Sequence, residues 1–298
     1  MAQGLVTIAV GLPQSFSVSN GFCSWFVLKR KILLTNDDGV MSKGLWLVRE
    51  ALEGLGELLL IAPERPQSAT SMSLTFHKPL RVDKVTIDGC DAYSVSGSPA
   101  DCVSIGVKKI LEGEKPDIVI SGINEGDNTS AQVLFASGTV AAAIQGAIED
   151  IPAVAFSIAL DPDNPSFVSE LLESSAVISE IVREIVHWVI ENRLPSGADL
   201  LNVNFPSRLG MHTPIVATKL AKRKFSNFVV ERLDPRNKPY YWQSGDLIHE
   251  NLDKDTDVYQ VLANRAVSIT PITLDLSVKI DESLPLLIER LSQLKGKQ

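Results

Sequence analysis

The chain has 298 residues, of which 45% are hydrophobic and 21% are charged, and its formal net charge is −8. This composition is typical of a globular protein with a large core, and the acidic balance argues against a general attraction to nucleic acid. The three cysteines, Cys23, Cys90 and Cys102, form neither an even disulfide set nor a CxxC zinc pattern. We therefore expect a cytoplasmic protein.

Residues 1–30 differ in composition from the rest of the chain. They contain no Asp or Glu, and the basic run Lys29-Arg30-Lys31 closes the segment. Its apolar part, Leu5–Leu12, is too short to span a bilayer, and the positive charges follow it instead of preceding it as in a secretory signal. We predict a disordered extension over residues 1–30 and no membrane association.

The first folded stretch is a strand that ends in two carboxylates. Lys31–Thr35 is a short apolar run of the kind found in buried parallel strands, and Asn36-Asp37-Asp38-Gly39 follows it as a loop. Taken alone, the loop fits an ordinary turn before a helix. Two adjacent acids also repel each other unless a cation lies near them, which makes a hard divalent ion the alternative.

Strands and helices alternate along the rest of the chain. The predicted helices are Gly44–Leu55 with Gly56 as its C-cap, Ser98 to about Leu111, Val140–Ile148, Phe167–Asn192 and Glu282–Leu294. The further predicted strands are Glu57–Ala62, a hairpin of Arg81–Ile87 with Ala92–Val95, Asp117–Ser121, Pro152–Ser157, Leu200–Phe205 and Ala266–Thr270. This alternation predicts an α/β fold, a Rossmann-like, doubly wound, mostly parallel sheet with an inserted β-hairpin, whose last strand is Leu200–Phe205.

We divide the chain into a catalytic core, residues 31–206, and a C-terminal hairpin, strand and helix region, residues 207–298. Basic and aromatic residues gather between positions 219 and 242, which is also a pattern of surfaces that bind single-stranded nucleic acid. A solvated or subunit-binding hairpin is the alternative, and the acidic balance of the whole chain favours it.

Three polar loops follow predicted parallel strands: Asn36–Gly39, Glu64–Ser71 and Gly122–Asn128. The carboxyl ends of strands in a doubly wound sheet line one crevice, so the two acids should lie near Ser68 and Asn124. These oxygens suit a hard cation. Backbone N–H groups at the helix start Ser137–Thr139 suit a phosphate. A metal beside an anion site indicates phosphoryl transfer.

Four motifs, in this order and spacing, make the sequence resemble the SurE family of survival proteins, which are metal-dependent 5′/3′-nucleotidases. They are Lys31–Gly39, Ala62–Ala69, Ser121–Asn128 and Ser137–Ala143. The resemblance implies one divalent metal ion per subunit, Mg²⁺ or Mn²⁺. The candidate residues are Asp37, Asp38, Ser68 and Asn124 for the metal, Asn36, Asn128, Ser137, Gly138 and Thr139 for phosphate or substrate, and Asp37, Asp38 and Asn128 for catalysis.

The resemblance implies a phosphomonoesterase acting on nucleoside 5′-monophosphates, with 3′-monophosphates and short polyphosphate as further candidates. It also implies a homodimer or homotetramer formed by exchange of C-terminal elements. One segment departs from the family pattern, since Thr129-Ser-Ala-Gln132 replaces Leu-Gly-Asp-Asp. The alternative function is therefore a nucleotide-binding regulatory protein with little turnover.

Overall fold

The computed structural model describes residues 30–161, 167–248, 250, 252–281 and 283–295. Apart from Arg30, the extension predicted for residues 1–30 lies outside these ranges, as does Ser166, which the sequence predicts as the N-cap of the helix beginning at Phe167. Among the described helices, none is long and apolar enough to cross a membrane.

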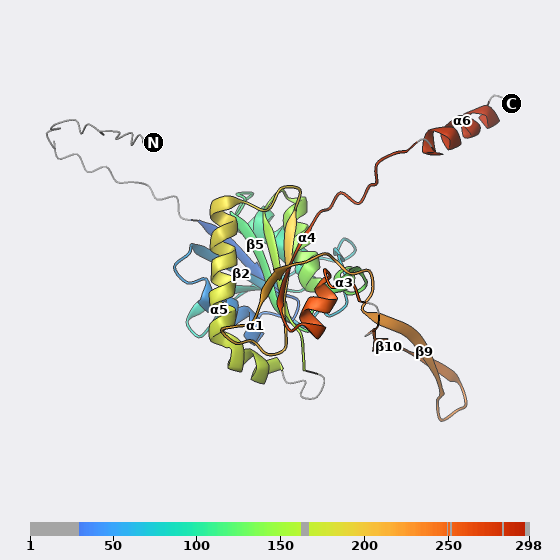
Figure 1. Ribbon diagram of the computed structural model, residues 1–298. Helices are drawn as coiled ribbons and strands as arrows, with labels where there is room; N and C mark the ends of the chain where they lie inside the picture. Colours follow the sequence, from blue (N-terminus) through green and yellow to red (C-terminus); the bar gives the residue numbers. More distant parts are fainter. Residues whose placement is uncertain (1–29, 162–166, 249, 251, 282, 296–298) are drawn as a thin grey trace, which may run out of the picture.

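One sheet organises the fold (Figure 1). Its strands are β1 (Lys31–Thr35), β2 (Glu57–Pro63), β3 (Val82–Ile87), β4 (Cys90–Val95), β5 (Ile118–Glu125), β6 (Ala153–Ile158), β7 (Leu200–Phe205), β8 (Ile215–Ala217) and β11 (Val267–Ile272). Within the described residues their spatial order is β3-β4-β2-β1-β5-β6-β7-β11-β8. From β4 to β7 every neighbouring pair is parallel. The predicted α/β fold is confirmed.

Helices cover both faces of the sheet. They are α1 (Lys43–Ala51), α2 (Pro99–Ile105) with the π-helical turn η1 (Gly106–Ile110), α3 (Ser130–Leu134), α4 (Gly138–Ile148) and α5 (Phe167–Asn192). Helices α1 and α5 pack together over one face, and α2 and α4 over the other. Successive residues of β1 point to opposite faces, so Leu34 joins one apolar core and Leu33 the other.

Helix boundaries follow local signals closely where a cap is present. Ser98 and Asp101 form a capping box at the start of α2, and Ser137 caps α4 by accepting a hydrogen bond from the Val140 N–H. The bounds of α5 are those predicted. Helix α1 ends earlier than expected, at Ala51, because the chain turns through Gly54 at φ +82° before it reaches Gly56.

Two predictions about the strands were wrong. Leu200–Phe205 is not the last strand, because β11 pairs antiparallel with β7 and β8 pairs with β11. The pairing of β11 with β7 joins residues more than 60 positions apart, which no local pattern reveals. Strand β5 also runs beyond Ser121 to Glu125, so Asn124 lies on the strand and pairs with Ser157 of β6 instead of lying in a loop.

The C-terminal region adds elements outside the sheet. A two-stranded ribbon consists of β9 (Phe225–Leu233) and β10 (Pro239–Leu247), a π-helical turn η2 spans Tyr259–Ala263, and α6 spans Ser283–Lys295. In Figure 1 the ribbon and α6 both project away from the body. Two basic residues of the region have acidic partners, since Lys219 pairs with Asp255 and Lys224 with Asp127.

Close packing against β6 makes Gly122 of β5 intolerant of a side chain. Its φ is +124°, and a Cβ atom there would lie 2.2 Å from the carbonyl oxygen of Phe156. We expect Gly122→Ala to lower the free energy of unfolding by more than about 3 kcal/mol in urea denaturation. The matched control is Gly89→Ala, where φ is +78° but no atom lies within 4 Å of the added Cβ. Equal losses in both variants would contradict the packing argument.

Candidate active site

The loop after β1 is closed by the side chain of Asn36. Asn36 is fully buried, its Nδ2 donates to the carbonyl oxygen of Gly39, and its Oδ1 accepts from the Gly39 N–H, both at 3.1 Å. Gly39 has φ +98°, a conformation that glycine adopts without strain. Both polar side-chain atoms of Asn36 therefore stabilise the loop. The loop places the carboxylates of Asp37 and Asp38 at the edge of the sheet.

Asp37 lies against the start of α4. It is 4% exposed, and its Oδ1 accepts a hydrogen bond from the Thr139 hydroxyl. Burial raises the pKa of Asp37, whereas hydrogen bonds from the Thr139 hydroxyl and from the backbone N–H groups of Gly138 and Thr139 oppose the rise. A Cβ atom at Gly138 would lie 2.9 Å from Asp37 Oδ2. Only glycine lets the carboxylate approach the positive end of this helix so closely.

Asp38 has a carboxylate oxygen with no partner. Burial, followed by the charge of Asp37, raises the pKa of Asp38 to about 7, and the backbone N–H of Glu125 opposes the rise. Its Oδ2 is buried without a hydrogen-bond partner among the described residues. Such an atom is costly unless a cation satisfies it. The backbone contact with Glu125 also brings the β1 loop to the end of β5, beside Asn124.

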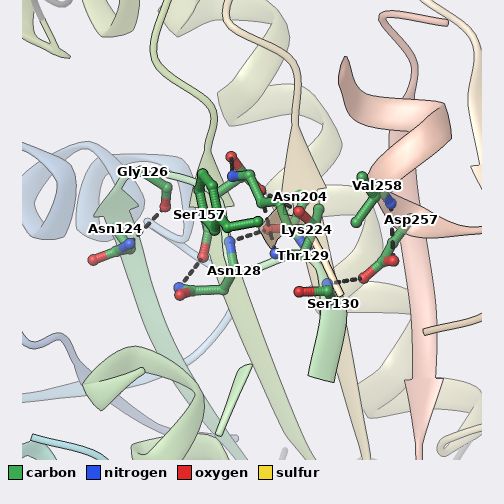
Figure 2. A network of polar contacts seen from close by, with 12 residues as sticks. Asn124, Gly126, Asn128, Thr129, Ser130, Ser157, Asn204, Lys224, Asp257 and Val258 are labelled. Atoms are coloured by element: carbon green, nitrogen blue, oxygen red, sulfur yellow. Dashed lines mark hydrogen bonds and ion pairs between the residues drawn. The ribbon is translucent and has the colours of Figure 1, made fainter. Parts of the chain in front are cut away.

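The amide of Asn124 is oriented by its own strand end. Its Nδ2 donates to the carbonyl oxygen of Gly126 at 2.6 Å. In Figure 2 the Oδ1 of Asn124 points away from Gly126, on the opposite side of the amide. An amide held in this way offers its oxygen as a ligand or acceptor.

Two backbone hydrogen bonds place Ser68 between the β1 loop and α4. The Gln67 N–H donates to the carbonyl oxygen of Asp37 at 2.7 Å, and the Ser71 N–H donates to that of Ala136 at 3.0 Å. Ser68 lies between these two anchors and is exposed. The structure therefore joins the loops after β1 and β2 to the residue that precedes Ser137.

Asn128 is held at its backbone and its side chain by buried groups of β6 and β7 (Figure 2). Its N–H donates to Asn204 Oδ1 at 2.7 Å, and its carbonyl oxygen accepts from Asn202 Nδ2 at 2.9 Å. Its Nδ2 donates to Ser157 Oγ at 2.8 Å. An amide Nδ2 carries two hydrogens, so one remains for a further acceptor.

Replacing Asn204 should therefore displace Asn128. Asn204→Leu leaves the buried Asn128 N–H without an acceptor, which costs about 1–3 kcal/mol of stability, and we expect kcat to fall by about tenfold. The matched control is Ser268→Ala, since Ser268 lies opposite Asn204 on β11 and its buried hydroxyl has no partner. Urea denaturation and steady-state kinetics measure both variants. Equal kinetics in both would show that Asn204 does not position Asn128.

Sequence reasoning missed a second polar group beside these residues. Asp127, 9% exposed, accepts from Lys224 Nζ at 2.5 Å, and Lys224 is itself 6% exposed. The sequence does contain an indication of the contacts that Asn202 and Asn204 make with Asn128. These two carboxamides lie on one face of a strand that is otherwise apolar. Lys224 carried no such signal, because it lies in a run of exposed basic residues.

The segment that departs from the family pattern, residues 129–132, docks on the C-terminal region. The Ser130 N–H donates to Asp257 Oδ2 at 2.8 Å, and Gln132 Oε1 accepts from the N–H of Phe225 at 3.0 Å. Burial raises the pKa of Asp257, and three backbone N–H groups oppose the rise. Gln132, which replaces an acid of the pattern, thus has a structural partner here.

The side chains present fit a hard cation. Within the described residues no group of three or more His, Cys, Asp and Glu side chains could hold a metal ion. A cation would therefore depend on the carboxylates of Asp37 and Asp38 together with the neutral oxygens of Asn124 and Ser68. The unpartnered Asp38 Oδ2 and the oriented amide of Asn124 are oxygen donors of the kind that Mg²⁺ and Mn²⁺ prefer.

These features define an α/β protein with an oxygen-rich site at the point where the strand order reverses, between β1 and β5. The survival protein SurE family model matches residues 32–227. A 5′-nucleotidase SurE from Methanocella arvoryzae is 42% identical over 248 residues, covering 83% of this chain and 93% of that protein. One from Thermofilum pendens is 43% identical over 247 residues, covering 82% and 90%.

Among solved structures, the SurE protein from Aquifex aeolicus aligns with a TM-score of 0.72 at 35% identity, covering 88% of this chain and 99% of that one. The chain belongs to the SurE family.

Proposed function

We propose that this protein is a metal-dependent phosphomonoesterase that releases phosphate from nucleoside 5′-monophosphates. The observation that carries the proposal is the unpartnered oxygen of Asp38, buried beside Asp37 and the start of α4. A cation ligand next to the positive end of a helix is an arrangement that suits phosphoryl transfer. The relatives from Methanocella arvoryzae and Thermofilum pendens are named 5′-nucleotidases, which fits this reaction.

In this proposal Asp37, Asp38, Ser68 and Asn124 hold one Mg²⁺ or Mn²⁺ ion. When bound, the ion supplies positive charge for a phosphoryl oxygen and lowers the pKa of a bound water. The chain fixes the geometry around it, since Asn36 closes the loop that carries both acids. This rigidity is what holds the two carboxylates together despite their repulsion.

The phosphate would be bound by groups that follow β5 and by groups at the start of α4. The second Nδ2 hydrogen of Asn128 is free to reach a phosphate oxygen, because Ser157 takes only one. Ser137, Gly138 and Thr139 lie at the positive end of α4, which favours anions. The N–H groups of Gly138 and Thr139 donate to Asp37, so we propose the Ser137 hydroxyl, which accepts from the Val140 N–H, as the donor to the phosphate.

A substrate panel tests the function. Phosphate release is measured with 5′- and 3′-nucleoside monophosphates and with short polyphosphate, each at saturating Mn²⁺ or Mg²⁺. We expect release from the 5′-monophosphates. Turnover of none of these compounds, together with tight nucleotide binding, would favour the alternative of a regulatory protein. That alternative arose from residues 129–132, whose side chains and backbone have partners in the C-terminal region.

We also propose that the C-terminal elements form contacts between copies of the chain, giving a dimer or tetramer in the cytoplasm. Helix α6 carries Leu284, Ile288 and Leu291 on one stripe, and the ribbon carries Tyr241 and Trp242, all at least 43% exposed. Both elements project from the body (Figure 1). Exposed apolar faces of this kind mark interfaces.

Light scattering on the full-length protein tests the assembly. We expect the mass of a dimer or tetramer, and a smaller mass for Ile288→Asp. A monomer at high protein concentration, or an unchanged mass in the variant, would contradict the role of α6.

A further inference from the structure

A cavity of about 830 Å³ lies beside the candidate active site. Residues directly after β5, β6 and β7 line it, so it opens at the same carboxyl edge of the sheet as the two acids. Two of its lining residues, Gly126 and Asp127, lie between Asn124 and Asn128 in the sequence. A group bound in this cavity would therefore be adjacent to a phosphate held by Asn128. Its volume is in the usual range for small-molecule sites.

Two aromatic side chains line the cavity, Phe225 at the start of β9 and Tyr259 in η2. Phe225 is fixed at its backbone, because Gln132 Oε1 accepts from its N–H at 3.0 Å and Gln132 Nε2 donates to its carbonyl oxygen at 3.4 Å. Lys224 Nζ lies 5.0 Å from the Phe225 ring centroid. The backbone of Phe225 is thus held in place before any ligand arrives, which reduces the entropy lost on binding.

Three of the four charged residues that line the cavity, Asp127, Asp161 and Lys224, are in ion pairs, and the fourth, Arg265, is exposed. Lys224 forms an ion pair with Asp127 at 2.5 Å, and Asp161 forms one at 2.9 Å with Arg208, which is not among the lining residues. The rest of the lining is mostly apolar, with Leu160 as an example. A second phosphate would have only the exposed Arg265 to attract it, whereas a flat, neutral aromatic ring would bury apolar surface against the aromatic side chains.

We infer that this cavity binds the nucleoside part of the substrate, with the base against Phe225 and Tyr259 and the phosphate at the candidate active site. The inference rests on the proposed function for the identity of the ligand. It adds a subsite built by residues 224–225 and 259–265, which makes the C-terminal region part of substrate recognition.

The test compares Tyr259→Leu, which keeps an apolar side chain but removes the ring, with Tyr259→Phe, which keeps the ring. Base stacking on an aromatic side chain is worth about tenfold or more in affinity. We expect Tyr259→Leu to raise KM for adenosine monophosphate by about tenfold and Tyr259→Phe to leave it within twofold. For ribose 5-phosphate, which has no base, all three proteins should have the same kcat/KM.

Saturation-transfer difference NMR with adenosine, in EDTA, separates this inference from the proposed function, because adenosine needs neither the metal nor turnover. We expect signals from the base protons with the wild type and with Tyr259→Phe, and weaker signals with Tyr259→Leu. Equal adenosine signals in all three proteins, or no signal in any, would overturn the subsite even if the chain hydrolyses nucleotides. Failure to hydrolyse any nucleotide, with the adenosine pattern intact, would instead overturn the proposed function alone.

Discussion

Asp38→Asn is expected to lower kcat/KM for adenosine 5′-monophosphate by at least about a hundredfold. The substitution keeps the size of the side chain and removes the negative charge whose oxygen is buried without a partner. If this oxygen binds the metal ion, its loss weakens metal binding and removes charge stabilisation at the transferred phosphoryl group. Phosphate release at several Mn²⁺ concentrations measures the effect, and excess metal should recover only part of the activity.

Glu125→Gln is the matched control for this prediction. Glu125 is an exposed acid beside Asn124 whose charge acts on Asp38 only by repulsion. Neutralising it changes the net charge by the same amount, and we expect kcat/KM to stay within about threefold, because exposed charges are largely screened. If both variants lose activity equally, the loss is due to the change in local negative charge and not to the loss of a metal-binding carboxylate at Asp38.

The stability of the metal-free protein should fall as pH rises through 7. The native pKa of Asp38 is raised from the ordinary 3.8 to about 7. Between these two values the folded carboxyl holds a proton that the unfolded carboxyl has released. The contribution of the protonated Asp38 to the free energy of unfolding is therefore full below pH 3.8 and is lost as the pH approaches 7. From pH 5 to pH 8 we expect a loss on the order of 2 kcal/mol, measured by urea denaturation in EDTA.

Two comparisons make the pH effect specific. Asp38→Asn should show a smaller loss between pH 5 and pH 8, with the remainder due to Asp37 and Asp257, whose pKa values are also raised by burial. Mn²⁺ should stabilise the wild type more at pH 8 than at pH 5, because the ion binds the deprotonated carboxylates. If the stability of Asp38→Asn depended on pH as that of the wild type does, Asp38 would be ruled out as the source of the pH dependence.

Much of the site could be predicted from sequence because local signals and strand ends placed it. The run Lys31–Thr35 predicted β1, and the three polar segments were placed at strand ends that meet at one edge, although the third begins inside β5, which continues to Glu125. The helix start at Ser137 was predicted for the same local reason, and the structure shows Ser137 as the N-cap of α4. Each of these sequence patterns lies within a few residues of the side chain whose position it predicts.

The supporting contacts could not be predicted, because they join distant segments. Asp127 and Lys224 are 97 residues apart in the sequence, and Ser130 and Asp257 are 127 apart. Nothing near Lys224 distinguishes it from its exposed basic neighbours. The antiparallel pairing of β11 with β7 was missed for the same reason, since a strand pattern indicates the element and not its partner.

The most direct test of the metal-site account is phosphate release from adenosine 5′-monophosphate by protein stripped with EDTA, before and after addition of Mn²⁺. We predict no release above background from the stripped protein and full recovery when about one equivalent of Mn²⁺ has bound per chain. Undiminished release from protein verified to be free of metal would contradict a metal site at Asp37 and Asp38.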